Sequence, residues 1–168
     1  VPVTAGSSNG ALASYAYITG PRPEGTAIAS LISLGGPATF KRAGNHVPGR
    51  IIRSLRFLRH RFLMRILAPI SGYWHPSPIQ LIHNPENMDG ATQRRAMVNL
   101  ISNFSRNELL QYGDWLLNDV FRSIDHRRDY RAEMPRIDVP ALFLAGPRDL
   151  LAPPDAVKDA YELVSSTD

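Results

Sequence analysis

Three short apolar runs stand out along the chain, at residues 1–5, 28–34 and 139–145. The second and third, IASLISL and VPALFLA, are nearly continuous rather than alternating, and each ends at glycine or proline. Such runs are typical of strands in a parallel sheet whose two faces are both covered. We therefore predict three parallel strands, each leading into a loop.

Helical patterns follow the first and third apolar runs. Residues 10–19 are rich in alanine and stop before Gly20 and Pro21, which is a typical helix end. After the third run, Pro154 and Asp155 open a second helical segment, AVKDAYELV. Strands that alternate with helices in this way predict an α/β fold with parallel strands and flanking helices.

A long helical segment separates the second and third strands. One apolar face recurs there at helical spacing, formed by Ile51, Leu55, Leu58, Phe62 and Ile66. Residues 87–103 indicate another helix, and Ser105 followed by Glu108 is a capping box that opens a third.

This order of elements predicts the domain organisation. Residues 1–40 and 136–168 would form one sheet-containing core, and residues 41–135 would be a helical lid or cap inserted into it. The lid placement follows from the order of the elements alone.

Composition narrows the class of protein. The chain has 168 residues, of which 43% are hydrophobic and 20% charged, as in globular proteins and unlike disordered ones. The chain contains no run of 18 apolar residues, so the sequence predicts no transmembrane helix. The absence of cysteine excludes disulfides, thiolate metal sites and a cysteine nucleophile within these residues, and it fits either redox compartment.

The net charge of +4 is concentrated in one stretch of the chain. Its basic residues are Lys41, Arg42, Arg50, Arg53, Arg56, Arg59, Arg61 and Arg65. For residues 50–67, two interpretations stay open: transient contact with a lipid surface, or a solvated basic face of a lid helix. Nucleic acid is not expected as a partner, because Phe57, Phe62 and Trp74 form no recognisable stacking platform.

The sequence Gly6-Ser7-Ser8-Asn9-Gly10 lies between the first strand and the first helix. In the pattern G-x-S-x-G, a tight strand-to-helix turn exposes the serine hydroxyl, and the flanking glycines remove side chains that would clash. Ser8 is then the candidate nucleophile, and the Asn9 N–H is one half of an oxyanion hole. The alternative interpretation is an ordinary Gly/Ser turn in which Ser8 caps the helix.

A carboxylate follows the third strand, in Gly146-Pro147-Arg148-Asp149. A catalytic triad needs an acid that orients its histidine, and the carboxyl end of a parallel strand is a suitable place for it. We predict Asp149 as this acid. Asp155 is the neighbouring rival, although it stands where a helix N-cap is expected, and the alternative for Asp149 is a turn aspartate that fixes its own loop.

These segments together resemble the α/β-hydrolase superfamily. GSSNGALASYAYI is similar to its nucleophile elbow, IASLISLGGPATF to the strand that follows, and IDVPALFLAGPRDLLAPPDAVKDAYELV to the strand that delivers the acid. Residues 83–130 further resemble the lid of bacterial lipase/esterase-like members, with some likeness to polyhydroxyalkanoate synthases.

The resemblance implies a serine hydrolase that cleaves small-molecule or lipid carboxylic esters through an acyl-enzyme, without a cofactor. Two alternatives stay open. One is an acyltransferase or polyester-synthase-like enzyme on the same fold, and the other is a non-catalytic protein that kept the fold.

The catalytic histidine is missing from the expected order. The family order is nucleophile, acid, histidine, but every histidine here precedes Asp149: His46, His60, His75, His83 and His126. We therefore interpret the chain as an internal fragment whose catalytic histidine lies beyond residue 168, and a lid histidine as base is the less favoured alternative. The histidines show no metal-binding spacing, so no metal site is expected.

Overall fold

A computed structural model describes residues 2–22, 27–47, 49–71, 73, 85–99 and 103–166. Its sheet has three parallel strands in the order β1-β2-β3, which are Val3–Ser7, Ser30–Leu34 and Ala141–Leu144. Ala5 lies beside Ile32, and Ile32 lies beside Leu142. The three predicted strands and their parallel arrangement are confirmed.

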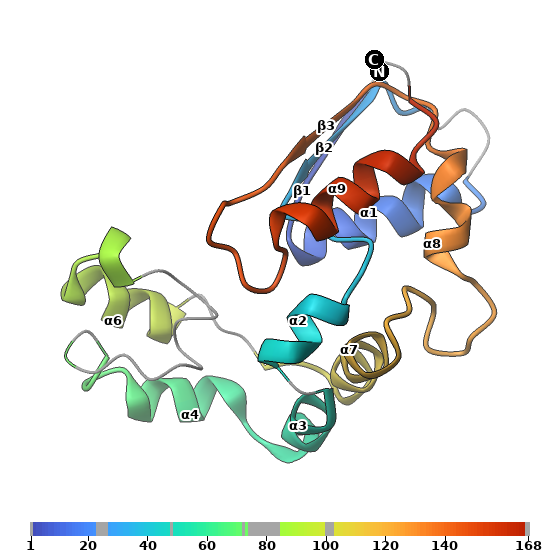
Figure 1. Cartoon of the computed structure of the whole chain (residues 1–168). Helices are drawn as coiled ribbons and strands as arrows, with labels where there is room; N and C mark the ends of the chain where they lie inside the picture. The colour runs from blue at the N-terminus through green and yellow to red at the C-terminus, as the bar shows by residue number, and fades with distance from the viewer. Residues whose placement is uncertain are drawn as a thin grey trace.

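One face of this sheet is covered by helices (Figure 1). These are α1 (Asn9–Thr19) and α9 (Pro154–Leu163), whereas α8 (Tyr130–Glu133) and the short 3-10 helix η3 (Met134–Arg136), which continues it, pack against α1. Leu31 and Ser33 point into this layer and are fully buried. The Tyr15 hydroxyl of α1 donates to Gly36 O at 2.9 Å and lies 2.5 Å from Ser33 Oγ, so α1 is held against β2.

The opposite face of the sheet is open, which corrects the prediction that the strands are covered on both faces. Val3, Leu34, Leu142 and Leu144 are exposed on it. Side chains alternate between the two faces of a strand, and the described helices pack only on the face that carries Leu31. The nearly continuous apolar runs therefore supply one buried row and one exposed apolar row.

The segment between β2 and β3 is helical. Its elements are α2 (Lys41–His46), α3 (Gly49–Ser54), η1 (Leu55–Phe57), α4 (His60–Leu67), η2 (Pro85–Asn87), α6 (Gly90–Asn99) and α7 (Arg106–Asn118). In Figure 1, α2, α3 and α7 lie beyond the end of the sheet at which the strands end, and α4 and α6 lie farther away. No described helix is both long and apolar enough to cross a membrane.

The single apolar face expected over residues 51–66 is wrong, because three helical pieces replace one helix. The break lies at Leu58 and Arg59, where ψ is 143° and 85°, outside the helical range. The pieces also pack on different partners, since α3 contacts α7 and α4 contacts α6. One straight helix could not pack against both α7 and α6.

Two helix starts in this segment are set by capping side chains. Ser105 Oγ accepts from Glu108 N at 3.1 Å, and Glu108 Oε2 accepts from Ser105 N at 2.6 Å, so the predicted capping box is confirmed. The helix expected over residues 87–103 begins later, at Gly90, because Asp89 Oδ1 accepts from Ala91 N at 2.9 Å. Residues 100–102 of that prediction lie outside the described part of the chain.

Helix α7 and the sheet share one hydrophobic core, whereas α4 and α6 pack together in a separate cluster. Trp115 of α7 packs against Phe40 and Phe121, and Phe121 packs edge-on against Tyr15 of α1. All four aromatic side chains are buried. This aromatic cluster joins α7 to the helix that follows β1.

Candidate functional site

Ser8 adopts a conformation that serine rarely takes. It stands between β1 and α1 with φ 50° and ψ −114°. Ser8 N donates to Leu34 O at 2.7 Å, and Ser8 O accepts from Ala11 N at 3.0 Å. A non-glycine residue in such a region costs on the order of 1–3 kcal/mol and persists only where its surroundings hold it. This strand-to-helix turn has the strained geometry of a nucleophile elbow.

The two glycines of the motif have different roles. A Cβ on Gly6 would lie 2.3 Å from Gly10 C and 2.5 Å from Ala11 N, which no real structure tolerates. A Cβ on Gly10 would meet nothing within 4 Å. The expectation that both glycines prevent a clash therefore holds for Gly6 and is wrong for Gly10, because β1 passes under the start of α1 only at Gly6.

The Ser8 hydroxyl is available for chemistry. Ser8 occupies the N-cap position of α1, but its side chain makes no capping bond, and among the described residues Ser8 Oγ has no hydrogen-bond partner. The Asn9 N–H likewise donates to no acceptor in the described part of the chain. A free N–H at a helix start favours negative charge, so Asn9 can stabilise an oxyanion beside Ser8.

Asp149 follows β3, which lies on the other side of β2 from β1 and Ser8. Gly35 follows β2 and its N–H donates to Leu144 O at 2.7 Å, and a Cβ on Gly35 would lie 3.5 Å from Asp149 Oδ2. Ser8 and Asp149 thus follow the outer strands β1 and β3, whose backbones are two strand spacings, or roughly 10 Å, apart.

The two oxygens of Asp149 differ in their contacts. Oδ1 accepts from Leu151 N at 2.9 Å and from Ala152 N at 2.8 Å, which fixes the loop after β3. Among the described residues, Oδ2 has no hydrogen-bond partner. The carboxylate therefore holds its own turn with one oxygen and leaves the other open to a further donor.

The rival acid, Asp155, is engaged elsewhere. It forms an ion pair with Arg42 of α2. Pro153, and not Asp155, stands at the N-cap position of α9, so the expected capping role of Asp155 is wrong. The ion pair leaves Asp149 as the better candidate of the two.

Neither His46 nor His126 is bonded to Ser8 or Asp149. His46 ends α2 and His60 begins α4, whereas His126 is exposed and lies 3.9 Å from Asp114 Oδ2. His75 and His83 lie outside the described residues. Within the described part of the chain, no cluster of His, Cys, Asp or Glu could hold a metal ion.

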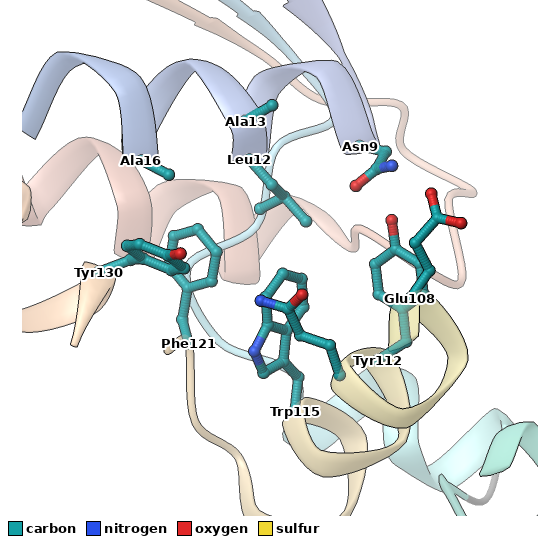
Figure 2. Close-up of a pocket in the computed structure, with 10 residues that line it drawn as sticks. Asn9, Leu12, Ala13, Ala16, Glu108, Tyr112, Trp115, Phe121 and Tyr130 are labelled. Atoms are coloured by element: carbon teal, nitrogen blue, oxygen red, sulfur yellow. The ribbon is translucent and has the colours of Figure 1, made fainter. Parts of the chain in front are cut away.

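A pocket of about 220 Å³ begins beside the elbow and runs between α1 and α7. Figure 2 shows Asn9 at one end, facing Glu108 and Tyr112 of α7, and Tyr130 near the other end. The apolar part of its lining consists of Leu12, Ala13, Ala16, Trp115 and Phe121. The rest of the lining consists of Asn9, Glu108, Gln111, Tyr112 and Tyr130, so the pocket combines apolar and polar side chains.

Tyr112 adds a hydrogen-bond donor at the end of the pocket where Asn9 lies. Burial and, secondarily, the charge of Glu108 raise the pKa of Tyr112 to about 12. Its hydroxyl thus keeps its proton at neutral pH. Sequence reasoning missed Tyr112 and Glu108 as pocket residues: the capping box predicts where α7 begins, but not which helix its faces meet.

The aromatic residues of the segment between β2 and β3 lie in different surroundings. Trp115 and Phe121 line the pocket, Tyr73 is exposed, and Trp74 lies outside the described residues. Trp115 Nε1 donates to Arg122 O at 2.7 Å, which leaves its ring face to the pocket.

Comparison with protein-family models and with curated proteins finds no match.

Proposed function

We propose that the protein is a serine hydrolase of the α/β-hydrolase fold that cleaves carboxylic esters through an acyl-enzyme. The observation that carries this proposal is the strained turn at Ser8, which presents a free hydroxyl at the start of α1. A purely structural turn has no need of this strain, because serine at an N-cap normally uses its side chain to cap the helix. The free N–H of Asn9 supports the same interpretation.

The chemistry divides into two acyl transfers. Ser8 Oγ attacks the ester carbonyl while a histidine takes its proton, the carbonyl oxygen becomes an oxyanion near Asn9 N–H, and the alcohol leaves with that proton. Water then attacks the acyl-enzyme and releases the carboxylic acid. Asp149 orients the histidine through Oδ2.

We place this histidine beyond residue 168, as the order of the family that the chain resembles would require. Ser8 and Asp149 follow β1 and β3 at the carboxyl edge of the same sheet, which supports a third group that contacts both. No lid histidine is needed in this arrangement.

The substrate that fits best is an ester with an apolar acyl part. Apolar and aromatic side chains form part of the lining of the pocket between α1 and α7, which reaches Asn9, the residue next to the proposed nucleophile. Its volume of about 220 Å³ suits a short acyl chain or one aromatic ring. The Tyr112 hydroxyl and the Glu108 carboxylate lie at the end where the ester group itself would be.

The test is active-site labelling of the full-length protein with a fluorophosphonate, followed by mass spectrometry to locate the label. We expect label on Ser8, loss of label and of p-nitrophenyl ester turnover in Ser8→Ala, and no loss in Ser7→Ala. Ser7 is the matched control because it is the preceding serine, exposed on β1 and outside the positive-φ position. Turnover that survives Ser8→Ala would refute Ser8 as the nucleophile.

Two alternatives make different predictions in the same assay. An acyltransferase or polyester synthase would also be labelled at Ser8, but it would pass the acyl group of a thioester to an acceptor other than water. A non-catalytic protein would show no label at Ser8. The bonds from Leu151 N and Ala152 N to Asp149 favour keeping this last candidate, because they give Asp149 a structural role of its own.

A further inference from the structure

Helix α4 presents an outward face that mixes arginine with large apolar side chains. Arg61, Phe62, Arg65 and Ile66 are all exposed there, with 63% of Phe62 and 57% of Ile66 accessible. The spacing i, i+1, i+4, i+5 places the four on one side of the helix. We call these four residues the α4 face.

The opposite side of α4 is already packed. Met64, Leu67 and Ala68 lie against Met97 and Val98 of α6. This packing fixes α4 with its arginine-bearing side outward. A separate set of apolar residues therefore forms the buried side of α4, and Phe62 and Ile66 are exposed in addition to it.

The segment before α4 has the same character. In and just after η1, Phe57 is 77% exposed, and Leu58 and Arg59 are also exposed. The Arg56 guanidinium lies 4.7 Å from the centre of the Phe57 ring. Large apolar groups and arginines thus continue from η1 into α4.

The positive charge of this region has no internal counter-charge. The sequence contains no Asp or Glu between Glu24 and Glu86. Within the described part of the chain, no ion pair neutralises any arginine of residues 50–67. The arginines are Arg50, Arg53, Arg56, Arg59, Arg61 and Arg65.

We propose that the α4 face and η1 bind the surface of a lipid bilayer that contains anionic headgroups. Arginine near an anionic leaflet gains roughly 1 kcal/mol per side chain, and Phe62 and Ile66 can enter the boundary between headgroups and acyl chains. A second copy of the chain is a poor occupant, because two identical basic faces repel each other. This inference does not depend on Ser8 chemistry.

The test is co-sedimentation of the full-length protein with vesicles of phosphatidylcholine alone or mixed with phosphatidylglycerol. We expect binding to the mixed vesicles, little binding to phosphatidylcholine alone, and weaker binding as salt is raised. Replacing two arginines in the variant Arg61→Gln/Arg65→Gln should weaken binding roughly thirtyfold. The matched control, Arg106→Gln/Arg127→Gln, removes the same charge from exposed arginines outside this region and should bind nearly as the parent does.

The apolar part of the proposal has its own variant. Phe62→Ser should weaken binding, whereas Tyr17→Ser, which removes an exposed aromatic residue from α1, should not. Circular dichroism checks that each variant is folded. Equal loss in both arginine double variants would show that net charge alone acts and would overturn the proposed site. Two results would overturn the lipid assignment. One is that a DNA duplex competes with the vesicles and that its binding depends on Arg61 and Arg65, and the other is that the protein self-associates through these two residues.

Discussion

Substitution of the two motif glycines by alanine separates what the turn at Ser8 requires from what the motif only suggests. In Gly6→Ala, the new Cβ would lie 2.3 Å from Gly10 C, 2.4 Å from Gly10 O and 2.5 Å from Ala11 N. All three are backbone atoms, so no side-chain rotation relieves the overlap. Carbon contacts are normally about 3.5–4 Å, so the start of α1 would have to retreat by roughly 1 Å.

The expected cost is large for a single methyl group. Overpacking costs typically about 1–3 kcal/mol, and the rigid partners place Gly6→Ala near the upper end. For a chain of this length, about 3 kcal/mol lowers the melting temperature by roughly 6–12 °C. Gly10→Ala adds a methyl group in open space within α1, so it should stabilise the protein by about 0.5–1 kcal/mol or leave it unchanged.

Thermal and urea unfolding followed by circular dichroism measures both variants under the same conditions. Each variant adds one methyl group at a glycine of the same five-residue motif, so each is the control for the other. The reasoning would be refuted if Gly6→Ala melted within 2 °C of the parent, or if Gly10→Ala were as destabilised as Gly6→Ala.

Two further predictions concern the sheet and an ion pair. Leu31→Ala should cost about 2–5 kcal/mol, because Leu31 is 0% exposed. Leu142→Ala should cost under about 1 kcal/mol, because Leu142 is 50% exposed on the open face; equal losses in urea unfolding would contradict the one-sided core. The hydrogen bond and charge of Arg128 lower the pKa of Glu133, so its stabilisation is present above the usual glutamate pKa of about 4.3 and is lost as pH falls through the lowered value. Glu133→Gln should therefore make the melting temperature depend less on pH between about 3 and 5, and an unchanged pH profile would contradict this.

Features that depend on neighbouring residues in the chain were predicted well. The second and third strands and the helices after β1 and β3 appear where the apolar runs and the Gly and Pro stops placed them, and β1 extends two residues beyond the apolar run at residues 1–5. The capping box of Ser105 and Glu108 was predicted in full, because both hydrogen bonds connect residues three apart. The G-x-S-x-G pattern likewise predicted a turn between strand and helix at Ser8.

The misses share one cause, which is that each depends on which segments meet. The apolar face over residues 51–66 was assigned to one helix, but α3 and α4 pack on different partners. Asp155 has the local pattern of a capping residue, yet its carboxylate pairs with Arg42 from another helix. Glu108 and Tyr112 carry no pattern that predicts a pocket, because their partner α1 is about a hundred residues away in the sequence.

The candidate site depends both on local sequence patterns and on contacts between segments that are distant in the sequence. Ser8, Asn9 and Asp149 were selected from short motifs, and their roles in catalysis stay predictions. The structure adds that Ser8 and Asp149 follow the two outer strands of the same sheet and that each keeps one side-chain oxygen without a partner among the described residues. Motif spacing could not show this, because β1 and β3 are separated by most of the chain.

By itself, the sequence determined the strands, the capping box of Ser105 and Glu108, the turn at Ser8 and the concentration of arginine before Glu86, since each follows from residues within a few positions of one another. Only the tertiary structure decided which face of the sheet is covered, which of the two motif glycines is sterically required, and where a pocket opens beside Asn9. The physical reason is that burial, overlap and cavities depend on atoms brought together from distant segments. Local patterns restrict the conformation of each segment but not its neighbours.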